Sequence, residues 1–285
     1  MNFKPVFFWG IVLSVVLLGK PSSVYAQIQP YRYKFRITYK MTFQPDSTNS
    51  KNIQQEFMGL FVGDHQSFFS SLKYIMMDSA ITSEAFRGNA MGPSIGFFEA
   101  HGTHITMCVF KTDTNIYFYD QAVQFIPTVY TYSEPKSVFH WKVSGDTMTI
   151  NSLFCQKATV NYGNRKWIAW FATDIPISDG PYKFCGLPGL IIKVSDSQNT
   201  WNFQMQGVAR IQKDLQINFN NKKPKPLEGR KAFLKIKTYD KYHKFQIYKL
   251  KGWTFSNPLA TKKEFERNAR KKNNWIELYK PKNEK

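Results

Sequence analysis

Apolar and polar side chains alternate along most of this chain, which is the pattern of half-buried β-strands. The run Tyr31–Phe43 (YRYKFRITYKMTF) shows the alternation most clearly. Shorter segments of the same kind recur between turns rich in Gly, Asn, Asp and Pro. They predict further strands at Ile53–Val62, Ser67–Met77, His104–Lys111, Asn115–Asp120, Phe125–Tyr132, Ala158–Tyr162, Lys166–Thr173, Leu190–Val194, Trp201–Arg210 and Phe233–Thr238.

The spacing of these segments indicates the fold class. A further hairpin is expected from Val138–Val143 and Thr147–Ile150 around Ser144-Gly145-Asp146, and residues 79–102 are expected to be irregular apart from a short helix. Short strands with a turn every ten residues or so are typical of antiparallel structures. We therefore predict a mainly β fold, either a strongly curved antiparallel sheet or a partly open β-barrel or sandwich, with a C-terminal helix.

That helix is predicted at about residues 259–280. Asn257-Pro258 can begin it, and Thr261 with Glu264 has the spacing of a capping box. Phe265, Ala269 and Ile276 recur on roughly one face, and basic residues cover the remainder. Such a helix can dock on the sheet with its charges in water, or it can lie on an anionic surface.

The N-terminus resembles an export signal. Lys4 precedes the apolar run Val6–Leu18, and small residues from Ser22 to Ala26 offer a cleavage point before Gln27. The run is too short for a bilayer span, which takes about 20 residues. We expect a signal peptide at 1–26, cleaved after Ala26, and a single β-rich domain at 27–285 without a transmembrane segment. This domain would reside in the periplasm or the cell envelope.

Composition narrows the choice of partners. The formal net charge is +19, and the chain contains 25 Phe, 15 Tyr and 7 Trp. A basic exported protein favours lipid, peptide or an anionic envelope surface over nucleic acid, although simple solubility accounts for the same charge. Of the cysteines Cys108, Cys155 and Cys185, one pair can form in an oxidising compartment. Cys155 with Cys185 is the predicted pair, and three buried thiols are the alternative.

Motifs for catalysis are weak. Gly92–Gly96 (GPSIG) matches the nucleophile elbow of α/β-hydrolases, but no strand precedes it and Pro93 abuts Ser94. His101 and His104 lack further ligands in a defined register, so neither a metal site nor a cofactor is expected. Asp174 and Asp179 fit local turns, and their spacing does not establish an acid pair.

Two segments suggest a binding surface instead. Lys166–Ala172 (KWIAWFA) is apolar on both faces, so Trp167 and Trp170 require cover by protein or by an apolar ligand. Gly180–Val194 (GPYKFCGLPGLIIKV) contains Pro188-Gly189, which predicts a type II turn with a positive φ at Gly189. A rigid loop held to the sheet needs no ligand. In that structural interpretation Arg165 donates to the carbonyl groups of the loop.

The block from Tyr132 to Asp196 resembles the GLPGLI family. The resemblance rests on Tyr132-x-Glu134-Pro135, Trp141, Phe154-Cys155-Gln156-Lys157-Ala158, Arg165-x-Trp167-x-Ala169-Trp170-Phe171, Ile175-Pro176-Ile177 and Gly180-Pro181-Tyr182-Lys183-Phe184-x-Gly186-Leu187-Pro188-Gly189-Leu190-Ile191. It implies an exported protein of Bacteroidota with no established activity, cofactor or catalytic residue. Asn164, where the family usually has Gly, puts a tight turn in doubt, and Cys185 is a second departure.

These observations favour a non-catalytic binding protein in the periplasm or envelope. Its ligand would be apolar or amphiphilic, received between the aromatic strand and the GLPGLI loop. The candidate ligand-binding residues are Trp141, Arg165, Trp167, Trp170, Phe184, Leu187 and Pro188. One alternative is an interaction module that docks on a membrane or protein through its basic surface. Another is an uncharacterised hydrolase that uses Ser94.

Overall fold

One twelve-stranded sheet dominates the computed structural model, which describes residues 31–83, 102–121 and 128–279. Its strands lie side by side in the order β12-β6-β5-β4-β3-β2-β1-β11-β10-β9-β8-β7. The strands are β1 (Tyr31–Phe43), β2 (Gln54–Val62), β3 (Ser67–Ser71), β4 (Cys108–Lys111), β5 (Asn115–Gln121), β6 (Val129–Pro135), β7 (Lys142–Ile150), β8 (Leu153–Tyr162), β9 (Arg165–Ala172), β10 (Leu190–Asp196), β11 (Trp201–Leu215) and β12 (Lys225–Pro226).

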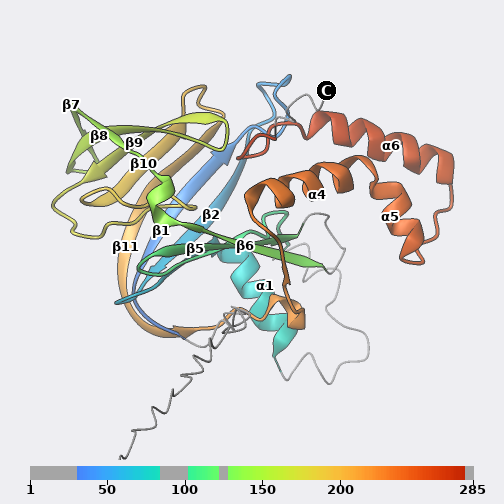
Figure 1. Ribbon diagram of the computed structural model, residues 1–285, viewed down its shortest axis with the longest axis horizontal. Helices are drawn as coiled ribbons and strands as arrows, with labels where there is room; N and C mark the ends of the chain where they lie inside the picture. The colour runs from blue at the N-terminus through green and yellow to red at the C-terminus, as the bar shows by residue number, and fades with distance from the viewer. Residues whose placement is uncertain (1–30, 84–101, 122–127, 280–285) are drawn as a thin grey trace, which may run out of the picture.

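Pairing is antiparallel throughout except for β12, which lies parallel to β6. The long strands β1 and β11 pair along their whole length at the middle of the sheet, and two register shifts interrupt the pairing. Such irregularities bend a strand and increase its twist. The sheet is strongly curved (Figure 1) and is not closed into a barrel, which confirms the predicted β class and favours the curved sheet over the barrel.

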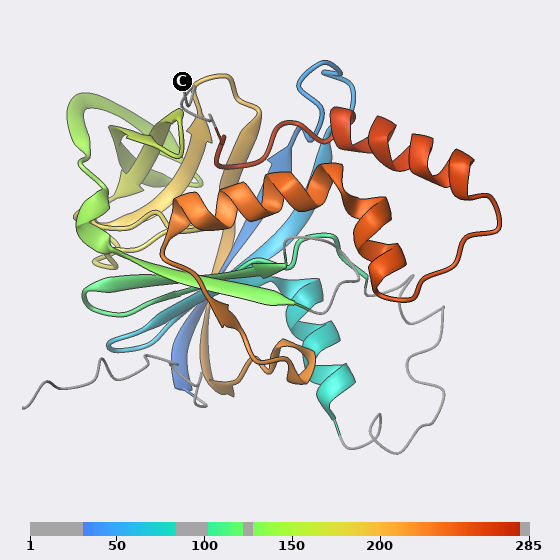
Figure 2. The same ribbon diagram turned by 45° about the vertical axis from the view of Figure 1, so that its right-hand side comes forward.

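Four α-helices accompany the sheet in the described part of the chain: α1 (Leu72–Thr82), α4 (Arg230–Tyr242), α5 (Lys244–Leu250) and α6 (Pro258–Lys271). Two short 3₁₀ turns, η1 (Lys136–Val138) and η2 (Phe219–Asn221), connect strands. Figure 2 shows α4, α5 and α6 together on one side of the molecule and α1 separately, below the green strands. After α6 the chain returns to the sheet as an extended tail, residues 272–279.

Two apolar clusters occupy the two faces of the sheet. The smaller one packs α1 against residues such as Tyr33, Phe68 and Tyr119. The larger one includes Ile37 and most of residues 180–194, which we call the GLPGLI segment, together with parts of α4 and the tail. Tyr33 and Ile37 would share one face of a regular strand, yet they lie in different clusters because a register shift separates Tyr33 from Phe35.

Several predicted elements are wrong in type or extent. The strand predicted at Ser67–Met77 ends at Ser71, because the Ser71 hydroxyl accepts a 3.2 Å hydrogen bond from the Tyr74 amide and so caps α1. The late strand predicted at Phe233–Thr238 is part of α4, where adjacent Phe233 and Leu234 both turn into the core. Consecutive buried residues fit a helix face better than a strand with one buried face.

The predicted C-terminal helix exists but ends nine residues early. Asn257 caps α6 through its side chain, with Pro258 in the first turn, so Thr261 is not the cap. Ile276 is not on the helix face with Phe265 and Ala269; it lies in the tail and is fully buried. The hairpin expected at Ser144-Gly145-Asp146 is instead an irregularity within β7, and the chain reverses at Asn151 and Ser152, which have positive φ.

Candidate functional site

The GLPGLI segment fills space in the core of the protein, and we call it the plug. Phe184 is fully buried, and its ring lies 4.7 Å from Trp167 and 5.6 Å from Phe139, centroid to centroid. Leu187 is also buried in the same cluster. The indole of Trp141 donates a 2.8 Å hydrogen bond to the carbonyl oxygen of Cys185 and so fixes the segment from one side. The space predicted for an apolar ligand is therefore occupied by side chains of the segment.

The remaining candidate residues lie apart from this plug. Trp170 is half-buried on the opposite face of β9, with the Lys157 ammonium group 5.9 Å from its ring, so the strand is fully covered on one face only. Pro188 is exposed. None of the predicted ligand-binding residues lines either of the two cavities described below.

Glycine shapes the segment differently from the predicted type II turn. Gly189 does not have a positive φ; within the segment Gly186, at +89°, and Tyr182, at +55°, do. Gly189 is required because a Cβ there would lie 2.2 Å from the carbonyl oxygen of Ala172 at the end of β9. The backbone at residue 189 can pass this close to β9 only if residue 189 has no side chain. The predicted turn is wrong, and close backbone approach is the physical reason for the glycine.

Arg165 clamps the C-terminal tail. Its Nε donates to the carbonyl oxygen of Ile276 at 3.0 Å, and its Nη2 donates to Asn274 Oδ1 at 2.5 Å and to the Trp275 carbonyl oxygen at 2.7 Å. Its Nη1 pairs with Asp196 at 2.8 Å. The prediction that Arg165 donates to the carbonyl groups of the loop 180–189 is wrong; the carbonyl groups it binds belong to the tail.

The turn before Arg165 adds two further contacts to the tail. Gly163 and Asn164 both have positive φ, which matches a two-residue hairpin turn between β8 and β9. Asn tolerates this conformation, so the departure from the family pattern leaves the tight turn intact. The Gly163 carbonyl oxygen accepts from the Leu278 amide at 2.9 Å, and Asn164 Nδ2 donates to the Leu278 carbonyl oxygen at 2.6 Å.

A buried ionic cluster joins the plug to the tail. The ammonium group of Lys183, which is fully buried, lies 2.6 Å from Glu277 Oε1 and 2.9 Å from Glu134 Oε1. The Tyr162 hydroxyl donates to Glu134 and the Tyr182 hydroxyl to Glu277. Burial raises the pKa of both tyrosines, so their phenols stay protonated and act as donors. These contacts stabilise the tail against the plug.

The three cysteines are free and buried, so the predicted Cys155–Cys185 disulfide is not present. The two thiols lie in different segments, and each segment has its own contacts. Cys155 lies in β8, where its Sγ is 3.5 Å from the Leu153 carbonyl oxygen, whereas Cys185 pairs with Asp179 in an isolated bridge. Burial raises the pKa of Cys185 to about 11, as expected for an unreactive core thiol.

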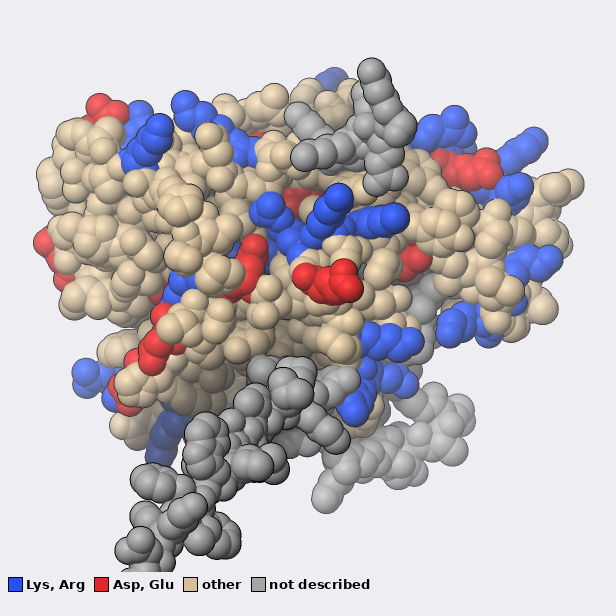
Figure 3. Space-filling view, in the orientation of Figure 1, with Lys and Arg blue, Asp and Glu red and all other residues tan. Residues whose placement is uncertain are grey.

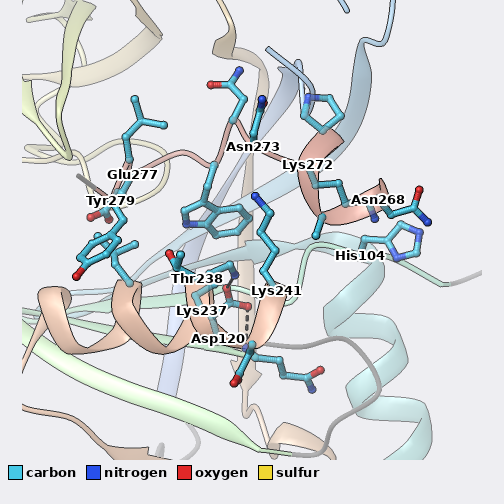
Figure 4. A pocket seen from close by; sticks show the side chains of 18 of the residues that line it. His104, Asp120, Lys237, Thr238, Lys241, Asn268, Lys272, Asn273, Glu277 and Tyr279 are labelled. Carbon is cyan, nitrogen blue, oxygen red and sulfur yellow. Dashed lines mark hydrogen bonds and ion pairs between the residues drawn. The ribbon is translucent and has the colours of Figure 1, made fainter. Parts of the chain in front are cut away.

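A cavity of about 450 Å³ lies between α4, α6, the tail and the middle of the sheet. Its walls are largely apolar, and Phe43 and Trp201 stack there at 4.7 Å. Trp275 of the tail projects into it with the Lys237 ammonium group 3.6 Å from its ring. Figure 4 shows Lys237, Thr238 and Lys241 rising from α4 opposite Asn268, Lys272 and Asn273.

Four lysines and three carboxylates, Asp120, Asp240 and Glu277, line this cavity, so positive charge exceeds negative charge by one. Lys237 pairs with Asp120 at 2.6 Å, and the carboxylate of Glu277 faces Lys183 and Arg230. Lys241, Lys244 and Lys272 also line the cavity, and none of them has an ion-pair partner in the described part of the chain. Burial, and then the charge of Lys272, lowers the pKa of Lys244. Lys244 and Lys272 both line the cavity and carry like charges, so an anion bound there would reduce their mutual repulsion.

A second, smaller cavity of about 280 Å³ lies beside the turn after β2. The fully buried ammonium group of Lys111 is at its edge, where it pairs with Asp179 and donates to the Gly180 carbonyl oxygen at 2.8 Å. Because the charge of Lys111 is satisfied by the plug, this pair braces the segment rather than offering a free cation.

Several predicted features lie outside the described residues: the signal peptide 1–26, the elbow Gly92–Gly96 with Ser94, and His101. Within residues 31–83, 102–121 and 128–279, no group of His, Cys, Asp and Glu could hold a metal ion. No helix in the same ranges is long and apolar enough to cross a membrane.

Sequence reasoning missed most of the cavity. The strand predicted at Phe233–Thr238 contains Lys237 and ends before Lys241, so it indicates a site at neither residue. Trp275 follows a basic run, and no local pattern marks it. A helical interpretation of residues 230–242 would have placed Leu234, Lys237 and Lys241 on one face, since they are spaced three and four apart. That spacing is the one sequence signal that could have predicted the side of the cavity formed by α4.

Residues 163–193 are similar to a family described as "Protein of unknown function (Porph_ging)", which is associated with Bacteroidota. This stretch begins at the β8–β9 turn and ends in β10. The name GLPGLI stays a prediction. No curated protein matches the sequence.

Two solved structures are similar to this chain at 12% sequence identity. One, described as "Structure of PNGF-II in C2 space group", has a TM-score of 0.49 and covers 73% of this chain and 33% of its own. The other, "Structure of PNGF-II in P21 space group", has a TM-score of 0.47 with 68% and 32% covered. The chain thus spans about a third of the length of these proteins.

Proposed function

We propose that this protein is a non-catalytic binding protein of the periplasm or cell envelope, and that its ligand is an anionic amphiphile. The ligand would occupy the 450 Å³ cavity between α4, α6 and the tail. The observation that carries the proposal is the combination of an aromatic wall with cavity lysines that have no carboxylate partner among the described residues. Export itself rests on the N-terminal signal predicted from the sequence.

The size and lining of the cavity support a small amphiphile. Pockets that enclose small ligands usually measure about 300–1,000 Å³ and are mainly apolar, with a few polar groups that fix orientation. Trp201, Leu234 and Trp275 offer the apolar surface. A carboxylate, sulfonate or phosphate at the other end of the ligand would relieve the repulsion between Lys244 and Lys272, which are left unneutralised by the protein.

This site differs from the one predicted from sequence, and an anionic amphiphile is one case of the apolar or amphiphilic ligand predicted there. Trp167, Phe184 and Leu187 fill the core and so build the wall behind the tail. The ligand-facing aromatic side chains are contributed by β1, β11 and the tail instead. The basic C-terminal region contributes Lys272, just beyond the end of α6, to the lining of the cavity.

Two dyes of similar shape test the proposal. 1-Anilinonaphthalene-8-sulfonate carries an anionic group, and N-phenyl-1-naphthylamine is its neutral counterpart. We expect the mature protein to bind the sulfonate dye at one site more tightly than the neutral dye. In Lys244→Gln/Lys272→Gln the dissociation constant of the sulfonate dye should rise at least tenfold, which corresponds to about 1.4 kcal/mol, while the neutral dye is unaffected.

The matched control is Lys231→Gln/Lys235→Gln, which removes the same charge from exposed positions of α4 that do not line the cavity. Fluorescence titration with both dyes gives the constants directly. An equal loss of affinity in the two double variants would reduce the effect to net charge and refute the proposed site. Equal affinity of the wild-type protein for both dyes would do the same.

A further inference from the structure

The connection between α5 and α6 exposes three large apolar side chains. Leu250 is 86% exposed at the end of α5, Trp253 is 50% exposed in the connection, and Leu259 is 76% exposed in the first turn of α6. We call these three residues the apolar tip. Figures 1 and 2 both show this connection at the far end of the helical layer, directed away from the sheet. The tip therefore projects into solvent at the periphery of the molecule.

The backbone of the tip is ordered by hydrogen bonds. The Gly252 amide donates to the Lys249 carbonyl oxygen and the Trp253 amide to the Tyr248 carbonyl oxygen, both at 3.0 Å. Gly252 has φ +85°, which closes α5 in the left-handed conformation common after helices. The Trp253 ring stacks on Tyr248 at 5.2 Å. The three side chains are thus held exposed by an ordered backbone. Their exposure to water has a free-energy cost that packing against the protein would have avoided.

Lysines flank the tip on both sides. Lys249 and Lys251 adjoin Leu250, and Lys262 and Lys263 follow Leu259; all four are exposed. In Figure 3 blue Lys and Arg atoms spread over the end of the molecule formed by α5 and α6, with a red acidic group among them. Lys262 lies 4.0 Å from Glu266, whereas Lys249, Lys251 and Lys263 have no ion-pair partner within the described residues. Apolar side chains surrounded by lysines match an anionic bilayer, where Trp and Leu enter the interface and the ammonium groups reach the phosphates.

We propose that the protein docks on an anionic membrane surface by inserting this tip. The inference goes beyond the proposed ligand site and does not depend on it. Three side chains are few for a stable protein–protein interface, which buries about 800 Å² on each partner. They suffice for reversible membrane attachment when basic residues add electrostatic attraction. The same helices bring Lys244 and Phe265 to the cavity, so docking would place the cavity near the lipid.

Vesicle sedimentation with the mature full-length chain tests the docking. We expect binding to vesicles of equal phosphatidylcholine and phosphatidylglycerol, and at least tenfold weaker binding to pure phosphatidylcholine. Leu250→Ser/Leu259→Ser should lower the partition constant on the anionic vesicles at least tenfold. Lys249→Gln/Lys251→Gln should weaken binding at low salt and lose most of that effect at high salt, because salt screens exposed charges.

The matched control is Phe154→Ser/Val208→Ser, which removes two exposed apolar side chains, 57% and 46% exposed, from β8 and β11 of the sheet. It should bind like the wild-type protein. Urea unfolding of each variant verifies that the fold is retained. Wild-type binding by Leu250→Ser/Leu259→Ser, an equal loss in the control, or no binding to anionic vesicles by the wild-type protein would each overturn the proposal. The last result would direct the search to a protein partner.

Discussion

The clamp formed by Arg165 and the tail gives the sharpest test of how this fold is held together. Arg165 is 7% exposed and reaches Asn274, Trp275 and Ile276 with one planar guanidinium group. The perturbation is a double-mutant cycle with Arg165→Met and Asn274→Ala. Met keeps much of the apolar stem of Arg, so the change removes the charge and the donors with little loss of packing.

The magnitude follows from the contacts. Removing one partner of a buried ion pair costs about 3–5 kcal/mol of the free energy of unfolding. The lower end applies here, because Asp196 would keep hydrogen bonds from the Thr200 amide at 2.6 Å and the Trp201 amide at 2.9 Å. Arg165→Met should therefore cost about 3 kcal/mol. Many domains have about 5–15 kcal/mol of stability, so the variant should still fold.

Asn274→Ala removes the acceptor for Arg165 and a donor to the Gln44 carbonyl oxygen at 2.7 Å, and should cost about 2 kcal/mol. The interaction between the two side chains is a charge-assisted hydrogen bond, for which we expect a coupling free energy of about 1.5–3 kcal/mol. Arg165→Lys keeps the charge but loses the planar guanidinium group with its fixed set of N–H donors. The free energy of unfolding of this variant should therefore lie between those of the wild type and Arg165→Met.

Urea unfolding followed by tryptophan fluorescence measures these free energies, with the dependence on denaturant compared across variants to verify that unfolding stays two-state. Limited proteolysis reports locally, because a released tail becomes a substrate. A coupling free energy below about 0.5 kcal/mol would refute the clamp, since independent sites add within that margin. So would a tail equally protected from proteolysis in wild type and Arg165→Met.

Two further predictions concern the GLPGLI segment. Gly189→Ala should lower the free energy of unfolding by about 3 kcal/mol or more, because its Cβ would lie 2.2 Å from the Ala172 carbonyl oxygen. Gly186→Ala, at φ +89° in open space, should cost only about 1–2 kcal/mol, and urea unfolding separates the two. The pKa of Cys185 is raised to about 11 from 9.0, so between pH 9 and 11 the unfolded state ionises while the folded thiol stays protonated. Stability should consequently fall over this range by on the order of 2 kcal/mol more in the wild type than in Cys185→Ser; parallel pH dependences would refute the buried thiol.

Most strands could be predicted from the sequence because the alternation of apolar and polar residues reports a half-buried face directly. Tyr31–Phe43 matches β1 at both ends. The errors fall where another constraint overrode the alternation. Ser71 ends β3 by capping a helix, and residues 230–242 contain a lysine pattern compatible with either period until the burial of Phe233 and Leu234 decides for the helix.

The site was harder to predict because it is built from contacts between distant segments. Trp167 and Phe184 are predicted ligand-binding residues, but sequence alone could not show that Phe184 itself packs against Trp167 in the core. The cavity draws on β1, β11, α4, α6 and the tail, and no short motif spans these elements. Arg165 was expected to bind carbonyl groups of the loop 180–189, yet its partners in the tail lie 109–111 residues away in the chain.

These contacts give the family-matching stretch an indirect relation to the proposed function. Residues 163–193 position the tail through Gly163, Asn164 and Arg165 at one end and through Lys183 near the middle. The tail then contributes Trp275 to the wall of the cavity. A chain that retains this stretch thus retains the means to hold a tail, whereas the cavity chemistry depends on α4, α6 and the residues after them. Proteins that share the stretch but differ in Lys244 and Lys272 should therefore hold a tail in the same way and differ in ligand.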